Sequence, residues 1–395
     1  MSGPLTGTTV IDFTRVLSGP YCTMVLADFG ARVLKIEHPV RGDDTRHWGP
    51  PFIGAESAYF LSINRNKESV TLDFKHPDGK AALDRLLATA DVVVENFRPG
   101  TLDAAGFGAA EMMKKYSRLI YCSVSGYGQT GPRRNEPGYD AVMQAEGGLM
   151  SITGAHDGPP FRLGVAITDI VSGLFAAQGV LAALVARHTT GRGQQVDIGM
   201  LDATAALLTY QAGNYFTTGD VPARMGNRHP TIVPYESFAT ADGDLVIAGG
   251  NDEIWRRLCG VLELPAMAAD ARFTTNRDRV AHYEVLKPQL DTVFRRRTRA
   301  EWVTRLQAAG VPCGSVREIN EVLADPQLAA RGMVAEVDHP TAGRAKVIAS
   351  PVKLSDTPAS VRTAPPILGQ HTAAVLAELG YDRNAIATMK DAGVI

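Results

Sequence analysis

The first third of the chain alternates short apolar runs with segments of helical periodicity. The helical patterns cover about 21–29 and 78–90. Continuous apolar strands that alternate with helices are typical of a parallel sheet covered on both faces. The pattern therefore predicts a Rossmann-like α/β arrangement. The expected strands lie at 8–14, 32–38, 69–74, 91–97 and 118–125.

A long apolar segment follows from Gly164. Its sequence, GVAITDIVSGLFAAQGVLAALVARH, has apolar residues at helical spacing and predicts a largely buried helix with Asp169 at its entrance. Gln178 interrupts the apolar stretch, which is shorter than the roughly 18 to 20 residues that span a bilayer, so we expect no membrane segment. The glycine turn TTGRGQ, the strand QVDIGM and a helix from about Leu201 to Tyr210 come next.

The pattern changes after about Met225. The segment SFATADGDLVIAGG predicts a hairpin that ends in a glycine turn. We expect a smaller inserted α+β domain at 226–325, between the N-terminal part of a large Rossmann-like domain at 1–225 and a C-terminal return at 326–395 that completes the large domain. Helices are expected in these two regions at 252–262, 283–295, 299–309, 319–332 and 372–379.

Composition narrows the class of protein. The 395 residues are 45% hydrophobic and 21% charged, which is typical of a globular enzyme. The net charge of -2 provides no overall field that attracts nucleic acid or an anionic membrane. The four cysteines form no CxxC pair and the nine histidines no HExxH pattern, so we expect neither a metal site nor disulfides. Since the start has no secretory signal pattern, a reducing cytoplasm is the expected location.

The segment GYGQTG at 126–131 is a GxGxxG motif placed directly after an expected strand. In a dinucleotide-binding fold this motif opens a helix whose N-terminus faces the pyrophosphate. Here Pro132 to Gly138 follow, with the composition of a loop. A nicotinamide or flavin site is therefore not expected, and no GxxxxGK[ST] motif indicates a P-loop.

Asp169 is the first candidate for chemistry. As a plain structural feature it would be an N-cap, because Asp accepts hydrogen bonds from free N–H groups in the first turn of a helix. An acid between Ile167 and Ile170 at the mouth of an apolar helix is also poorly solvated, which makes its carboxylate a stronger nucleophile. The residues themselves leave both interpretations open.

Five basic residues lie near the ends of the expected strands. The carboxyl ends of strands line the ligand crevice in doubly wound sheets, so we expect these cations to meet one polyanion, with solvated surface charge as the alternative. Gly249 and Gly250 also have two interpretations, a plain hairpin turn or a mobile cover over a reactive intermediate. The cations are Arg15, Lys35, Arg41, Lys75 and Arg98.

Several motifs together resemble the family III CoA-transferases (CaiB/BaiF, formyl-CoA transferase-like). They are DFTRVLSGPYCTMVLADFGARVLKIEHP, VVVENFRPGTL, SVSGYGQTGP, GVAITDIVSG and GRGQQVDIGMLDA. The resemblance covers nearly the entire chain. It implies a homodimer of two interlocked rings whose large domain binds CoA or acyl-CoA as a substrate, with no permanently bound cofactor and no metal.

The resemblance also implies roles for individual residues. The matching motif makes Asp169 the catalytic nucleophile. The residues expected at the acyl substrate or in the lid are Arg15, Tyr139, Gly249 and Gly250. The residues expected to contact CoA are Val16, Arg41, Leu72, Lys75, Asn96, Phe97 and Arg98.

Two alternatives to CoA transfer belong to other classes. The α-methylacyl-CoA racemases of the same superfamily add a histidine in the loop that corresponds to 137–140, where this chain has Tyr139, so one of the two acid/base groups that racemisation needs is missing. Racemisation is therefore the second choice. A non-catalytic nucleotide-binding protein is the third, and an intact Asp169 argues against it.

The glycine segment AGGND at 248–252 resembles that of family members that handle dicarboxylates. We therefore expect transfer of CoA from succinyl-CoA or a similar donor to an acceptor that is itself a dicarboxylate. The expected intermediates are an aspartyl anhydride and an aspartyl-CoA thioester. Arg15 is expected to hold the distal carboxylate, because a guanidinium favours bidentate contact with a carboxylate; a CoA or subunit contact is its alternative role.

Overall fold

The computed structural model describes residues 3–395, which form two compact units. Met1 and Ser2, which the expected first domain includes, lie outside the described residues. Unit 2 consists of Met150–Phe161 and Thr218–Asp325. Unit 1 takes its residues from Met1–Leu149, Arg162–Thr217 and Pro326–Ile395.

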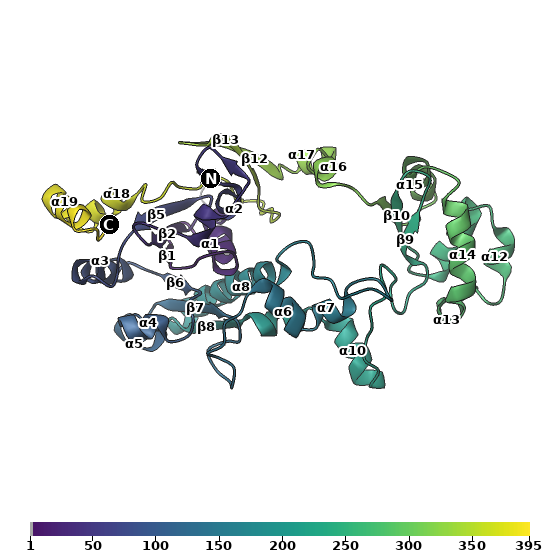
Figure 1. Cartoon of the computed structure of the whole chain (residues 1–395), viewed down its shortest axis with the longest axis horizontal. Coiled ribbons are helices and arrows are strands. Elements are labelled where there is room, and N and C mark those ends of the chain that lie inside the picture. Colours follow the sequence, from purple (N-terminus) through teal and green to yellow (C-terminus); the bar gives the residue numbers. More distant parts are fainter. Residues whose placement is uncertain (1–2) are drawn as a thin grey trace. The chain divides into compact units, whose positions relative to one another are not determined.

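Unit 1 is built on a 6-stranded parallel sheet (Figure 1). Its strands are short and alternate with helices along the chain, so the predicted α/β class with a parallel central sheet is confirmed. The chain winds outward from β1 in both directions, which makes β1 and β6 neighbours at the point where the winding reverses. In spatial order the strands are β5 (Lys67–Thr71), β2 (Arg32–Glu37), β1 (Thr9–Asp12), β6 (Val92–Glu95), β7 (Ile120–Ser125) and β8 (Gln195–Gly199).

Helices cover both faces of the sheet, because alternate residues of each strand point to opposite sides. Val92 and Val94 of β6 belong to a core cluster with residues of α1 (Ser18–Asp28) and α8 (Ile167–Thr190). Val93 belongs to the opposite cluster, whose helical residues come from α3 (Pro77–Leu87), α5 (Ala109–Lys115), α18 (Thr372–Glu378) and α19 (Arg383–Asp391). The C-terminal helices therefore pack on the sheet that the N-terminal third forms.

The α8 helix has the composition of a membrane span and packs one face against the core, but only 39% of its most apolar window is buried, so the prediction of a largely buried helix was wrong. It is the one helix of residues 3–395 that is long and apolar enough to cross a bilayer, with a mean hydropathy of 1.8. Its buried residues, among them Gly173, Ala177 and Val180, pack against α1 and the sheet. Gly173 allows the two helices to approach, because a Cβ there would lie 2.5 Å from the carbonyl oxygen of Ser18.

Two predicted helices are interrupted. The prediction of one helix at 319–332 was wrong: α16 (Ile319–Leu323) and α17 (Pro326–Ala330) are separate, because Pro326 has no N–H to donate and is accommodated at the start of a helix. The helix expected from Leu201 to Tyr210 is likewise divided, into α9 (Met200–Ala206) and α10 (Thr209–Thr218). Thr209 has a φ of +36° at this break.

Unit 2 contains a 3-stranded antiparallel sheet in the order β11 (Cys313–Ser315), β10 (Asp244–Ala248) and β9 (Tyr235–Ala239). The β9–β10 pair is the hairpin that the sequence predicts. Three apolar helices pack with these strands around the buried side chains of Trp255, Phe294 and Trp302. These helices are α11 (Asp252–Val261), α14 (Tyr283–Phe294) and α15 (Arg299–Ala308).

The bounds of unit 2 differ from the small domain expected at 226–325. The unit begins at Thr218 and also includes Met150–Phe161. Hydrogen bonds join these segments: Gly226 N–H donates to Gly154 O at 2.9 Å, and Arg224 donates from Nε to Gly158 O at 3.2 Å and from NH1 to Ser151 O at 3.5 Å. Local sequence pattern does not reveal such pairing, since it depends on contacts between distant segments.

Shorter elements, which the sequence pattern did not predict, complete the two units. In chain order they are the 3-10 helix η1 (Asp44–His47), β3 (Phe52–Ile53), β4 (Glu56–Ser57), α2 (Ala58–Ile63), α4 (Thr101–Ala105), α6 (Asp140–Glu146), α7 (Leu149–Ile152), α12 (Pro265–Ala269), α13 (Asn276–Ala281), β12 (Val334–His339) and β13 (Gly343–Ile348).

Candidate active site

The turn after β1 and the loop after β6 are joined where the winding of the sheet reverses. The side-chain oxygen of Asn96 accepts a hydrogen bond from Arg15 N–H at 2.8 Å, and the Asn96 amide donates to Arg15 O at 2.8 Å. Doubly wound sheets bind ligands in the crevice at such a reversal point. Two cavities lie at this crevice, and both Arg15 and Phe97 line each of them.

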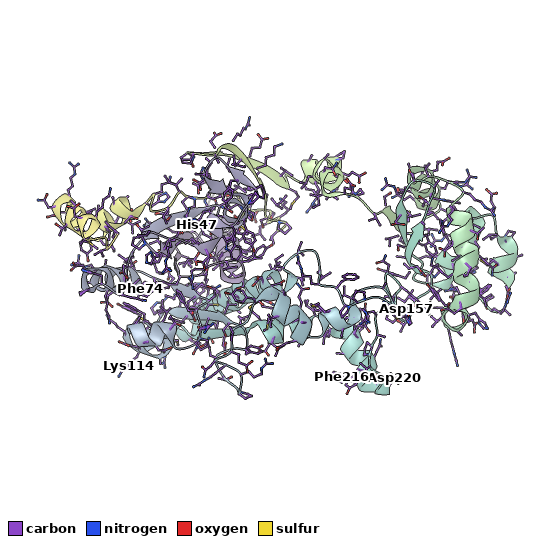
Figure 2. The ribbon with its side chains drawn as sticks, in the orientation of Figure 1. His47, Phe74, Lys114, Asp157, Phe216 and Asp220 are labelled. Atoms are coloured by element: carbon purple, nitrogen blue, oxygen red, sulfur yellow. The ribbon has the colours of Figure 1, made fainter. Side chains whose placement is uncertain are left out.

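The larger cavity has a volume of about 670 Å³ and lies over the ends of β1, β2 and β5. Phe74, labelled in Figure 2, is one of its lining residues and packs edge-on against Phe13, with ring centroids 6.0 Å apart. The two rings give the cavity an apolar wall. Of the residues expected to contact CoA, this cavity brings together Arg41, Leu72, Lys75 and Phe97.

The smaller cavity has a volume of about 180 Å³, and Asp169 is part of its lining. The lining residues come from the turn after β1, the loop after β6, the loop before α6 and the entrance of α8. These segments are distant in sequence, and the fold brings them together. The expected site residues in this cavity are Arg15, Val16, Asn96, Phe97, Arg98, Tyr139 and Asp169.

Lys35 is not available to a polyanion, so this part of the sequence prediction was wrong. Its side chain is fully buried, and its Nζ donates to Thr14 O and to Asp43 Oδ2, each at 2.8 Å. By contrast, Arg41 and Lys75 are exposed and form no ion pair with any residue of 3–395. Two of the strand-end cations around the larger cavity are therefore free to bind an anion.

Asp169 does not cap its own helix, so the N-cap interpretation was wrong. The N-cap residue of α8 is Ala166, which provides no side-chain hydrogen bond. The cap is supplied from a different segment: Asp140 Oδ1 accepts a hydrogen bond from Thr168 N–H at 2.9 Å. Gln144 holds Asp140 in place by donating from its Nε2 to Asp140 Oδ2 at 2.7 Å. The Asp169 carboxylate thus remains free for chemistry in the cavity.

The pKa of Asp169 is raised to about 7. Burial is the main cause, since only 9% of the residue is exposed, and the negative charge of Asp140 adds to it. A hydrogen bond from the Ser18 side chain acts in the opposite direction and lowers the pKa. A carboxylate with a raised pKa is a stronger nucleophile once it is ionised.

Sequence analysis missed the neighbours of Asp169. Burial, together with the charges of Asp169, Asp140 and Asp43, raises the pKa of Tyr59 to about 12, so this phenol of α2 faces the same group of acids. Asp140 directly follows Tyr139, which the family resemblance had singled out, and that adjacency was a usable signal. No local pattern indicates that Tyr59 comes near Asp169.

Arg15 lies between the two cavities in a defined orientation. Its guanidinium is 5.2 Å from the ring centroid of Phe97, and its NH1 is 3.5 Å from Asp44 Oδ2. The side chain remains 47% exposed. A guanidinium stacked on an aromatic ring keeps its N–H groups available at the edges. It is therefore able to accept a carboxylate from a ligand.

The GYGQTG loop is held against the sheet and opens no helix. Asp197 of β8 accepts hydrogen bonds from Gln129 N–H at 3.1 and 3.0 Å. The next helix, α6, begins only at Asp140. The geometry of a dinucleotide motif, in which a helix N-terminus faces the pyrophosphate, is not present at this loop.

The glycine turn of unit 2 has one restricted and one open glycine. Gly249 N–H donates to Pro234 O at 2.7 Å, and a Cβ on Gly249 would lie 2.8 Å from that oxygen. A Cβ on Gly250 would meet no atom within 4 Å. Asn251 then caps α11 by accepting a hydrogen bond from Ile254 N–H at 2.8 Å. The turn therefore has a fixed base at Gly249 and an unobstructed position at Gly250.

Comparison with known proteins decides the family. Residues 5–372 match the model of CoA-transferase family III. The chain belongs to the family III CoA-transferases. It is accordingly a transferase that uses acyl-CoA thioesters and carboxylic acids as substrates, and the predicted family and enzyme class are confirmed.

Relatives of this CoA-transferase align over almost its full length. A mouse protein named succinyl-CoA:glutarate CoA-transferase is 43% identical over 99% of this chain and 90% of its own. A succinate–glutarate CoA-transferase of Agrobacterium fabrum is 42% identical over 95% of this chain and 96% of its own. The crystal structure of a CaiB/BaiF family protein from Brucella suis superposes with a TM-score of 0.86 at 40% identity, covering 96% of this chain and 100% of that one.

The two cavities of this CoA-transferase differ in the charged groups that they offer to a ligand. The exposed cations Arg41 and Lys75 lie at the larger cavity and Asp169 at the smaller one, whereas Arg15 and Asp44 line both. Within residues 3–395, no group of three His, Cys, Asp or Glu side chains is arranged to hold a metal ion. The chemistry that the described residues offer is that of a buried carboxylate beside a cationic ligand cavity.

Proposed function

We propose that this enzyme transfers CoA from succinyl-CoA, or a donor of the same kind, to an acceptor acid that is also a dicarboxylate. The observation that carries the proposal is the Asp169 carboxylate, which is buried and unpaired with any cation in a cavity that Arg15 joins to a larger, cationic one. The donor and acceptor named for the mouse and Agrobacterium relatives support the substrate class.

The larger cavity is proposed to hold the nucleotide part of CoA. Its volume, its apolar wall and the exposed cations Arg41 and Lys75 suit a phosphorylated adenosine. Leu72 and Phe97 would contact the base and the pantetheine arm. Val16, Asn96 and Arg98 would follow the arm toward Asp169, with Asn96 acting through its backbone because its side chain is bound to Arg15. Neither a permanently bound cofactor nor a metal has a role in this scheme.

The proposed first half-reaction forms two covalent bonds to Asp169 in turn. The carboxylate attacks the thioester carbonyl of the donor, which forms an acyl-aspartyl anhydride and releases CoA thiolate. The thiolate then attacks the aspartyl carbonyl of the anhydride. This step releases the donor acid as its carboxylate and leaves an aspartyl-CoA thioester. No proton is gained or lost, so the site needs no separate acid or base.

The second half-reaction reverses these steps with the acceptor. The acceptor carboxylate attacks the aspartyl-CoA thioester, which gives a new anhydride and CoA thiolate. The thiolate attacks the acyl carbonyl, so that the new acyl-CoA leaves and the Asp169 carboxylate returns. Each anhydride must be kept from water. We assign this protection to Gly249 and Gly250 as a cover and to Tyr139, whose exposed side chain lies at the rim of the smaller cavity.

Arg15 is proposed to bind the distal carboxylate of the acyl group. Its stacking on Phe97 and its pairing with Asp44 hold the guanidinium at the boundary of the two cavities. A dicarboxylate attached to CoA would extend from Asp169 toward this guanidinium. The positive charge would favour dicarboxylates over monocarboxylates of the same length.

We further propose that two chains form an interlocked homodimer in the cytoplasm. Exposed apolar side chains on α8 and α10 support a subunit contact: Val185 is 70% and Phe216, at the end of α10 in Figure 2, 81% exposed. Four unpaired cysteines among residues 3–395 fit a reducing compartment. Sedimentation at nanomolar concentration tests the dimer, and folded monomers there would contradict interlocking.

Racemisation remains the weaker alternative. Tyr139 occupies the position where racemases have a histidine, and a neutral phenol is a poor base at neutral pH. If the enzyme were a racemase, it would exchange the α-proton of a chiral 2-methylacyl-CoA with deuterium from solvent. We expect no such exchange.

The decisive experiment looks for the covalent intermediate. The enzyme incubated with succinyl-CoA and no acceptor should carry an aspartyl adduct that hydroxylamine cleaves and borohydride reduces, and peptide mass mapping should place it on Asp169. Asp169→Asn should bind CoA but form no adduct. An adduct on a different residue, or full activity of the folded Asn variant, would refute the mechanism. A panel of free mono- and dicarboxylic acids, assayed for CoA exchange, identifies the acceptor class.

A further inference from the structure

The turn after β1 contains a strained residue. Val16 has a φ of +68°, in the left-handed region. This region is unfavourable for every L-residue with a side chain and most of all for a β-branched one. Such a conformation persists only where the surrounding structure imposes it, and residues of this kind concentrate at functional sites. Something must therefore hold the turn in place.

A buried ion pair holds both ends of this turn. The Lys35 ammonium donates to Thr14 O and to Asp43 Oδ2, each at 2.8 Å, and the other oxygen of Asp43 accepts from Val16 N–H at 3.3 Å. Both side chains are 0% exposed. Burial opposes ionisation of Asp43, yet the ammonium and the hydrogen bonds from Lys35 and Thr45 lower its pKa to about 2. The pair is thus ionised and locks Thr14 and Val16 relative to each other.

The locked turn leads directly to the nucleophile. Ser18, two residues after Val16, is the first residue of α1 and lines the smaller cavity with Asp169, where its side chain lowers the pKa of that carboxyl through a hydrogen bond. The Ser18 carbonyl packs against Gly173, one turn after Asp169 on α8. Arg15, at the centre of the turn, lines both cavities. A change in the φ of Val16 would displace Ser18 and Arg15 relative to each other, because they lie on opposite sides of that torsion.

We propose that Lys35 and Asp43 are positioning residues for CoA transfer, which hold Val16 in the left-handed conformation and thereby set Ser18 against Asp169 and Arg15 between the two cavities. The proposal rests on the role assigned to Asp169 above. It gives Lys35 a task that differs from the polyanion binding expected from its place at a strand end. Both residues line the larger cavity, but their side chains are 0% exposed and pair with each other, so their charges are not offered to a ligand.

The test removes both charges at once, because a single substitution would leave an unpaired buried charge. In the double variant Lys35→Met, Asp43→Asn, kcat should fall about a hundredfold, which is the effect of a misplacement near 1 Å. Binding of desulfo-CoA should change less than about threefold, because Arg41 and Lys75, the exposed cations of the larger cavity, are intact. A large loss of kcat with nearly unchanged affinity for desulfo-CoA distinguishes a positioning role from a general loss of the fold.

The pH profile gives a second readout. Loss of the Ser18 hydrogen bond raises the pKa of Asp169, so the midpoint of kcat/KM should move to higher pH. Asp43→Asn alone also has a direct electrostatic effect on the pKa of Asp169, and this effect has the opposite sign. Removing the negative charge of Asp43 favours the ionised form of the Asp169 carboxyl. Neither substitution removes any of the other charged and titratable groups around Asp169, which are Asp140, Tyr59, Arg15, Arg98, Asp44 and Glu136.

A glycine at position 16 should rescue the double variant. Glycine adopts a left-handed φ without a tether, so adding Val16→Gly to the double variant should recover kcat about tenfold. The same substitution in the natural sequence should bring no gain. Equal effects in the two backgrounds would overturn the proposal.

A control removes an ion pair at the opposite edge of the same sheet, where β1 and β6 begin. Arg187 NH2 pairs with Asp91 Oδ1 at 2.9 Å, and Asp91 Oδ2 accepts from Thr9 N–H. Arg187→Met, Asp91→Asn should lower thermal stability without changing kcat or the pH midpoint. If the Lys35, Asp43 double variant does not fold, Asp43→Asn alone carries the test through kcat, with an expected loss of about tenfold, because its direct electrostatic effect opposes the shift of the pH midpoint. A folded variant with unchanged kcat and midpoint refutes positioning, whereas activity in Asp169→Asn would refute the proposed function instead.

Discussion

Asp140 both positions and tunes Asp169. The Asp140 carboxylate accepts a hydrogen bond from Thr168 N–H at 2.9 Å and so caps the helix that carries Asp169. After burial, its negative charge is the second cause of the raised pKa of Asp169. The raised pKa means that the nucleophile is ionised only from about neutral pH upward. The pH dependence of activity measures this ionisation.

The activity of the enzyme should rise with pH through a midpoint near 7. Only the Asp169 carboxylate attacks the thioester, and its pKa is about 7. Asp140→Asn removes a neighbouring negative charge but keeps an oxygen for Thr168 N–H, so the midpoint of kcat/KM should move to lower pH. Profiles from pH 5 to 9 in one buffer mixture measure both values. An unchanged midpoint in the Asn variant would contradict the coupling of the two acids.

The stability of Asp169→Asn relative to the natural sequence should increase with pH. The folded-state pKa of Asp169 is above the value of about 3.8 for a free side chain, so the folded protein binds this proton more tightly than the unfolded chain does. The stabilisation from that proton is complete below pH 4 and is lost as pH rises to 7. The Asn variant has no titrating carboxyl at this position, so its stability does not fall over this pH range. At pH 8 the variant should be more stable by up to a few kcal/mol, at about 1.4 kcal/mol per pKa unit.

Urea unfolding at pH 4, 6 and 8 measures this difference. Asp169→Ala is a useful companion, because Asp140 rather than Asp169 caps α8 and the Ala variant should therefore keep its cap. A difference that stays constant with pH would mean that Asp169 has an ordinary pKa in the folded protein.

Arg15→Ala should lower the preference for dicarboxylates. The substitution removes the guanidinium that stacks on Phe97 at the boundary of the two cavities. We expect kcat/KM for a dicarboxylate acceptor to fall about ten- to a hundredfold, and that for a monocarboxylate of equal length to change much less. Arg134→Ala, at an exposed arginine outside both cavities, is the control for loss of one positive charge. An unchanged ratio would refute the assignment.

The two glycines of the unit 2 turn should differ in their tolerance of a side chain. Gly249→Ala would bring a Cβ to 2.8 Å from Pro234 O and should cost about 1–3 kcal/mol of stability. Gly250→Ala meets no atom within 4 Å and should stay within about 0.5 kcal/mol. Thermal unfolding compares the two. If Gly250→Ala is stable yet loses activity, the turn acts on the substrate rather than on the fold.

Much of the fold follows from local pattern. The apolar runs that became β1, β2, β5, β6 and β7 were recognisable because strands buried on both faces need continuous apolar residues. The prediction of one helix at 319–332 overlooked the break at Pro326, although proline lacks the N–H that a continuous helix requires. The pairing of Met150–Phe161 with Thr218–Asp325 was not recognisable, because nothing within either segment specifies the other.

The sequence by itself determined the α/β class, the family and the choice of Asp169, because periodicity and motifs are local and survive without knowledge of contacts. Only the tertiary structure decided which charges are free. Both Lys35 and Lys75 were expected at strand ends, yet Lys35 lies within β2 in an ion pair with Asp43, and Lys75 lies after β5, exposed at a cavity. The same holds for Asp169, whose burial and pKa depend on Asp140 and Ser18 from distant segments. Burial and the interaction between charges depend on distances in space. They therefore shift the pKa of Asp169 only after the chain has folded and its neighbours are in place.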